Sequence, residues 1–134
     1  MVNLAEVRKA NKALVTAQPL VAVFIGATWG IGEASVRALA RTHGVHGKGL
    51  RLYLVGRTQK NAEESLKECQ TLCPQGDFQF VKADDLRLLE DVDRVSAEIT
   101  DLEKEKSGLK GDIARIDILV MTQAYFNFDG RKGM

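Results

Sequence analysis

The chain has 134 residues, a length that favours one domain within the usual range of about 100 to 200 residues. Apolar residues make up 45% and charged residues 28% of the sequence, which is typical of a folded globular domain and excludes a disordered chain. The 19 basic and 18 acidic residues leave a net charge of +1. Such a balance gives no global field that would draw the protein to nucleic acid or to an anionic membrane.

No segment has the length of a membrane span. The longest apolar run, Leu20 to Gly26, is far shorter than the roughly 20 residues that a membrane-spanning helix needs. Charged residues also interrupt the N-terminal segment, where a signal peptide would be apolar. The sequence therefore predicts a cytoplasmic protein with neither a nucleic-acid nor a membrane partner.

Residues 2–17 have the spacing of an amphipathic helix, and Pro19 ends it. The apolar side of this helix consists of Leu4, Val7, Leu14 and Val15. Residues 20–25 then form an unbroken apolar run, as in a strand that is buried on both faces. Helical spacing returns from residue 30 to about residue 42, carried by Ile31, Ala34, Ala38 and Leu39.

Strands are expected at residues 50–55, 78–82 and 116–121, separated by two further helices. Thr58 is the plausible N-cap of the first of these helices, whose inward side is Ala62, Leu66, Cys69 and Cys73. The second is a long amphipathic helix along the apolar series from Leu88 to Leu102. Its charged face, interpreted as solvated surface, includes Glu98, Glu103 and Lys104.

The alternation of buried-type strands and helices predicts an α/β fold, a three-layer Rossmann-type doubly wound parallel sheet. About four strands are present, in the expected order 3-2-1-4, so the sheet is incomplete, and an extra helix precedes it. We expect residues 1–18 to form this N-terminal helix, residues 19–128 the partial dinucleotide-binding domain, and residues 129–134 a C-terminal tail.

Cys69 and Cys73 are four residues apart on one helix face, which favours two reduced thiols that pack as small hydrophobes. A metal site is the alternative interpretation. His43 and His46 lie in a separate glycine-rich loop, however, and no fourth ligand is evident.

The first strand and its helix are joined by Gly26-Ala27-Thr28-Trp29-Gly30-Ile31-Gly32. At such a helix start, free backbone N–H groups and the positive end of the macrodipole favour a diphosphate. Gly26 would make the sharp turn, Gly30 would clear a path for the cofactor, and Gly32 would let the helix pack tightly on the sheet. A merely structural turn is the alternative, whereas an NTPase phosphate loop is excluded because no Gly-Lys-Ser or Gly-Lys-Thr follows.

The glycines have the spacing G-x-x-x-G-x-G, not the commoner G-x-G-x-x-G. With this spacing, residues 23–39, VFIGATWGIGEASVRAL, closely resemble the first strand-helix unit of the short-chain dehydrogenase/reductase family. The stretch is similar in detail to reductases of fungal secondary-metabolite pathways, which also carry a helix ahead of the first strand. The resemblance implies a nicotinamide dinucleotide held by the loop residues Gly26, Thr28, Trp29, Gly30, Ile31 and Gly32.

The second strand ends in Gly56-Arg57-Thr58, where NAD-preferring relatives have an acidic residue for the ribose hydroxyls. Arg57, with Thr58 beside it, would instead hold a 2′-phosphate, so NADP(H) is favoured over NAD(H). Against this, Arg57 could be an ordinary surface residue, and Thr28-Trp29 stands where many NADP-preferring relatives have a basic residue.

After the third strand, the resemblance implies that Asp85-Leu86, with Asp84 as the other candidate, meets the adenine amino group. Taken alone, paired aspartates before a helix are more often an N-cap, and the two roles can coexist.

The resemblance weakens after the fourth strand. This sequence has Met121-Thr122-Gln123-Ala124 where the family has Asn-Asn-Ala-Gly, so Thr122 and Gln123 would have to supply substitute hydrogen bonds. The family's serine, its Tyr-x-x-x-Lys pair and its active-site asparagine all lie beyond this strand. Neither Tyr53 nor Tyr125 has a lysine four residues later, so we expect no catalytic residue in the sequence.

Three functions remain open. The first is the N-terminal, NADP(H)-binding portion of an oxidoreductase that transfers hydride between cofactor and a small carbonyl or alcohol substrate, shortened before its catalytic residues. The second is a non-catalytic NADP(H)-binding or partner-docking module, with self-association through the exposed edge of the fourth strand. A methyltransferase that uses S-adenosylmethionine is disfavoured, because the second strand ends in Arg57 rather than in an acidic residue.

Overall fold

The structure, a computed structural model, describes residues 1–107 and 114–123. Its elements, in chain order, are α1 (Leu4–Ala17), β1 (Leu20–Ile25), α2 (Gly30–His43), β2 (Leu50–Gly56), α3 (Gln59–Leu72), β3 (Asp77–Lys82), α4 (Leu89–Ser107) and β4 (Ile118–Met121). Every expected helix and strand is present. The expected tail at 129–134, and the end of the domain expected at 19–128, lie outside the described residues.

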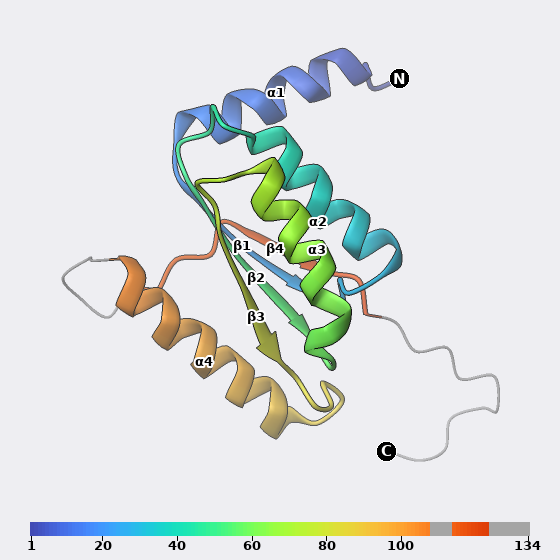
Figure 1. Ribbon diagram of the computed structural model, residues 1–134, viewed down its shortest axis with the longest axis vertical. Helices are drawn as coiled ribbons and strands as arrows, with labels where there is room; N and C mark the ends of the chain where they lie inside the picture. The colour runs from blue at the N-terminus through green and yellow to red at the C-terminus, as the bar shows by residue number, and fades with distance from the viewer. Residues whose placement is uncertain (108–113, 124–134) are drawn as a thin grey trace.

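The four strands form one parallel sheet in the order β3-β2-β1-β4, which confirms the predicted fold class and strand order. Helices α2 and α3 cover one face of the sheet and α4 covers the other, while α1 lies beside α2 (Figure 1). All four strands run in the same direction, so their carboxyl ends share one edge of the sheet. In doubly wound sheets this edge is where ligands bind.

The core has two parts, one on each face of the sheet. The part under α2 and α3 contains Leu20, Ala22 and Phe24 of β1, joined by every second residue of β2. The part under α4 contains the alternate residues of the same strands with Val95 and Ile99. The unbroken apolar runs of β1 and β2 are therefore explained by burial on both faces.

Of the four apolar residues that predicted α2, only Leu39 packs against the core. The buried residues are Gly32, Val36, Ala40 and His43, whereas Ile31, Ala34 and Ala38 are exposed. Small residues on the inner face let α2 lie close to the sheet. A similar difference holds for α1, of which only Val15 is buried; Leu4, Val7 and Leu14 are exposed.

The prediction that Glu103 lies on a solvated face of α4 is wrong, because its side chain is only 1% exposed. Its carboxylate accepts hydrogen bonds from Arg51 Nε at 3.0 Å and from the Tyr53 hydroxyl at 2.9 Å. A charge can be buried when it is paired and hydrogen-bonded in this way. Glu103 therefore fixes the second half of α4 against β2.

Cys69 and Cys73 are free and buried, as predicted. His43 ends α2 and is also buried, and its Nδ1 lies 3.0 Å from the Gly44 carbonyl and 3.1 Å from Cys73 Sγ. The amide of Gly49 donates to His43 Nε2, so the neutral ring carries its proton on Nδ1. The histidine thus closes the loop from α2 to β2.

The last strand differs from the prediction because it is buried on one face only. Ile118 and Val120 pack on the core below α2 and α3, whereas Leu119 and Met121 are 56% and 61% exposed. The strand is also shorter than expected and begins at Ile118. Within residues 1–107 and 114–123, β4 is an edge strand of the sheet.

Candidate cofactor site

The loop from β1 to α2 begins with a turn that only glycine makes without strain. Gly26 has φ +78°, and a Cβ built on it would lie 2.7 Å from the backbone nitrogen of Gln123. Both the left-handed backbone and the lack of space exclude a side chain here. Gly26 therefore lets the chain leave β1 close against the residues that follow β4.

The start of α2 is open. Gly30 has φ +66°, and a Cβ built on it would have no other atom within 4 Å. Trp29 is the N-cap residue, and no side-chain hydrogen bond caps the helix. The space beside Gly30 is thus open at the positive end of the helix macrodipole, where the first N–H groups of α2 have no side-chain cap, an arrangement suited to a phosphate.

Two large apolar side chains flank this opening. Trp29 and Ile31 are 78% and 82% exposed, so neither fills the space next to Gly30. Exposure of the Trp29 indole to water is unfavourable. A planar ligand that covered the ring would remove part of its apolar surface from water.

The other side of the loop is packed tightly. A Cβ on Gly32 would lie 2.6 Å from Ala27 Cα, so the first turn of α2 can approach the strand end only because residue 32 is glycine. The Thr122 hydroxyl donates to the carbonyl of Ile25 at 3.2 Å. This bond supports the predicted substitute role of Thr122 between β4 and β1.

Sequence reasoning missed one further close approach. A Cβ on Gly56 would lie 2.6 Å from Cγ2 of Thr28, so the end of β2 passes directly under the glycine loop. This contact positions Thr28, which is partly buried, and brings the next residue of the chain, Arg57, to the same edge of the sheet. Its only sequence signal was a glycine at the end of a strand.

Arg57 and Thr58 are both exposed where β2 ends. Thr58 takes the predicted N-cap position of α3, but its side chain makes no capping hydrogen bond. Within the part of the chain that the structure describes, Arg57 forms no ion pair. The guanidinium is thus available to an anion from solution.

Asp85 lies beyond β3, on the strand next to β2. Its carboxylate accepts hydrogen bonds from the backbone and the guanidinium of Arg87, the shortest being 2.8 Å to Nη2. Hydrogen bonds from the Arg87 side chain and backbone, with the positive charges of Arg87 and Arg57, lower the pKa of Asp85 to about 2. Asp85 is therefore ionised at any pH near neutrality and can only accept hydrogen bonds.

Asp85 does not cap α4. The helix begins at Leu89, and the carboxylate of Asp85 faces Arg87 instead. An adenine amino group would have to share this carboxylate with Arg87. Leu86 is partly buried against the core under α4, so its side chain is a support for the loop.

The structure thus brings the predicted residues to one edge of the sheet, from the loops that follow β1, β2 and β3 (Figure 1). No group of three or more histidine, cysteine, aspartate or glutamate side chains among the described residues is arranged to hold a metal ion. In the same residues, no helix is both long and apolar enough to span a membrane.

Fold and site together define a Rossmann-type α/β domain with a glycine loop where the carboxyl ends of the parallel strands lie. No family model matches the chain. The short-chain dehydrogenase/reductase SAT2 of Stachybotrys chartarum is 41% identical over 92% of this chain and 35% of that protein. Oxidoreductase AN1596 of Emericella nidulans is 31% identical over 98% of this chain and 35% of that protein. The NmrA-like family domain-containing oxidoreductase notO of an Aspergillus species is 31% identical over 98% of this chain and 36% of that protein.

Among solved structures, one described as a short-chain dehydrogenase from Pseudomonas syringae has a TM-score of 0.60. It is 23% identical in sequence and supports the fold; the match covers 84% of this chain and 38% of that one. The chain therefore corresponds to a part of the short-chain dehydrogenases/reductases and related fungal oxidoreductases. It spans about a third of the length of the curated relatives that it matches.

Proposed function

We propose that this chain binds NADP(H) at the glycine loop and is the cofactor-binding part of an oxidoreductase. The observation that carries the proposal is the open space at Gly30, where uncapped N–H groups of α2 meet a left-handed glycine that no described atom crowds. A diphosphate bridge placed there would accept hydrogen bonds from the first turn of the helix. The glycine spacing and the relatives' names agree with this use of the site.

The preference for NADP(H) rests on Arg57. Its side chain is exposed at the end of β2 and forms no ion pair among the described residues, although its charge acts on the nearby Asp85. A 2′-phosphate would gain charge-assisted hydrogen bonds from the guanidinium, whereas a free ribose hydroxyl would gain little. The adenine ring would then lie toward Asp85, between the ends of β2 and β3.

The chemistry that such a cofactor supplies is hydride transfer to a carbonyl or from an alcohol. The residues of this chain would bind and orient the adenosine and diphosphate, and the proton relay would have to come from other residues. A non-catalytic nucleotide-binding or docking module is the second candidate, favoured by the exposed edge at β4. The cytoplasmic location remains a prediction from the sequence.

The test compares NADPH and NADH binding to the wild-type chain and to Arg57→Ala by calorimetric titration. Loss of the phosphate contact, worth about 1.5 to 3 kcal/mol, would weaken NADPH binding by roughly 10- to 100-fold and leave NADH binding unchanged. Lys60→Ala removes an equal charge nearby on α3 and serves as the control. Equal NADPH affinity in the wild-type chain and Arg57→Ala would contradict the phosphate role, and no binding of either nucleotide would contradict the proposed function.

A further inference from the structure

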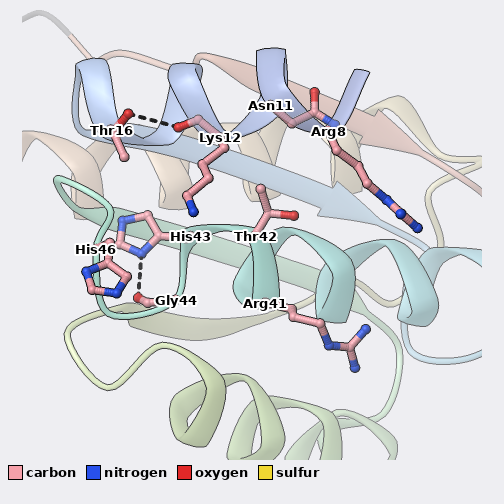
Figure 2. A pocket seen from close by; sticks show the side chains of 9 residues that line it. All are labelled: Arg8, Asn11, Lys12, Thr16, Arg41, Thr42, His43, Gly44 and His46. Carbon is pink, nitrogen blue, oxygen red and sulfur yellow. Dashed lines mark hydrogen bonds between the residues drawn. The ribbon is translucent and has the colours of Figure 1, made fainter. Parts of the chain in front are cut away.

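A hollow lies far from the glycine loop, between α1 and the carboxyl end of α2. It has a volume of about 370 Å³ and is lined by Arg8, Asn11, Lys12, Thr16, Arg41, Thr42, His43, Gly44 and His46. Figure 2 shows Arg8 and Lys12 extending from α1 toward α2, with Thr42 between the two helices and His46 on the loop that follows α2. Arg41 also lines the hollow, but its side chain extends from α2 on the side away from α1. Volumes of this order are typical of small-molecule sites.

The lining carries positive charge and no negative charge. Arg8, Lys12 and Arg41 contribute three cations, and no aspartate or glutamate lines the hollow. Within residues 1–107 and 114–123 none of these three forms an ion pair. Most arginines elsewhere in these residues do have a carboxylate partner, including Arg37, Arg51, Arg87, Arg94 and Arg115.

The helix macrodipole does not account for this concentration of charge. The carboxyl end of α2 carries the equivalent of about half a negative charge, which a single cation would balance. The last carbonyls of α2 are also partly satisfied, because Gly44 donates to Ala40 and Gly47 donates to His43. Two or more positive charges therefore remain without a described counterpart.

Some hydrogen-bond donors of the hollow already have acceptors within the protein, and others have none among the described residues. The hydroxyls of Thr16 and Thr42 donate to carbonyls of their own helices, those of Lys12 and Ala38. The ammonium and guanidinium groups and the Asn11 amide have no hydrogen-bond partner among the described residues. Such donors match the oxygens of a phosphate, which accept several hydrogen bonds at once.

From these observations we propose that the hollow between α1 and α2 binds a small phosphorylated molecule through Arg8 and Lys12, with the charge of Arg41 at its rim. The site is separate from the proposed cofactor site, because α2 begins at the glycine loop and runs for 14 residues, about 20 Å, to this end. The extra helix ahead of the sheet thereby gains a role: it supplies two of the three cations.

The test is a titration of the labelled chain with pyrophosphate at low ionic strength, followed by ¹H–¹⁵N nuclear magnetic resonance. Pyrophosphate also suits the start of α2, so the readout must separate the two places. Amide signals of residues 8–16 and 41–46 report the hollow, whereas those of residues 26–32 report the glycine loop. Screening is weak at low salt, which makes exposed charges most visible.

We expect saturable shifts at residues 41–46 in the wild-type chain. The affinity for pyrophosphate that they report should fall by about 3- to 10-fold in Lys12→Ala and in Arg41→Ala. Lys9→Ala removes the same charge from the same helix outside the hollow and should change the affinity little. Equal weakening in all three variants would show diffuse attraction and overturn the proposal, as would shifts confined to residues 26–32. Because the two sites have separate signals, failure here would leave the proposed cofactor site untouched.

Discussion

Glu103 shows how one carboxylate joins elements that are distant in the sequence. It is buried on α4, yet its partners Arg51 and Tyr53 are on β2, 52 and 50 positions earlier in the sequence. Periodicity placed Glu103 on a polar face, and nothing local in the sequence signals this long-range pairing. The cost of burying its charge is offset only while both partners remain.

Replacing Glu103 with alanine should therefore destabilise the chain. Arg51 and Tyr53 would lose charge-assisted hydrogen bonds, and we expect the free energy of unfolding to fall by about 2 to 3 kcal/mol. Urea denaturation followed by circular dichroism measures this change. Glu105→Ala, an exposed carboxylate on the same helix, is the matched control, and an effect of equal size in both variants would contradict the account.

Tyr53 makes the free energy of unfolding depend on pH in a direction that can be predicted. Burial, together with the hydrogen bond to Glu103 and the negative charge of that residue, raises the pKa of Tyr53 above its ordinary value. The unfolded chain would lose this proton first, so the contribution of Tyr53 to stability is complete below about pH 10 and declines as the pH rises further. Unfolding free energies at pH 8 and pH 11 should differ more in the wild-type chain than in Tyr53→Phe. Parallel losses in the two proteins would contradict the shift.

At the scale of elements, the sequence predicted the strands to within two residues of their ends, because apolar runs and glycines mark them directly. It predicted less well which side of a helix is buried. In α2 the inner face is made of small residues and His43, and a period of apolar residues does not reveal such a face. The partners of His43, Cys73 and the amide of Gly49, come from chain segments that only folding brings together.

The edge at β4 leads to a prediction at this scale. Leu119 and Met121 are exposed on a strand that pairs on one side only among the described residues. An apolar edge of this kind favours pairing with another chain. Analytical ultracentrifugation of the 134-residue chain should show association that increases with concentration and is reduced in Leu119→Lys. A monomer at every concentration would contradict this.

In the whole molecule, the parallel sheet brings the loops after β1, β2 and β3 together at the carboxyl ends of the strands. The hollow lies at a different place, between α1 and the carboxyl end of α2. The glycine spacing was enough to predict the cofactor site, because the backbone or the packing at these loop positions requires glycine, and glycines are visible in the sequence. The hollow was not predicted. Arg8 and Arg41 are 33 positions apart, and only the packing of α1 beside α2 brings them to one cavity.

The central claim is that the N–H groups opening α2 bind the diphosphate of a nicotinamide dinucleotide. The most direct test is to titrate the ¹⁵N-labelled chain with NADPH and follow the backbone amides of Gly30, Ile31 and Gly32. The account predicts large, saturable shifts at these amides, accompanied by quenching of Trp29, the one tryptophan in the chain. Unchanged amide signals at millimolar NADPH would contradict it.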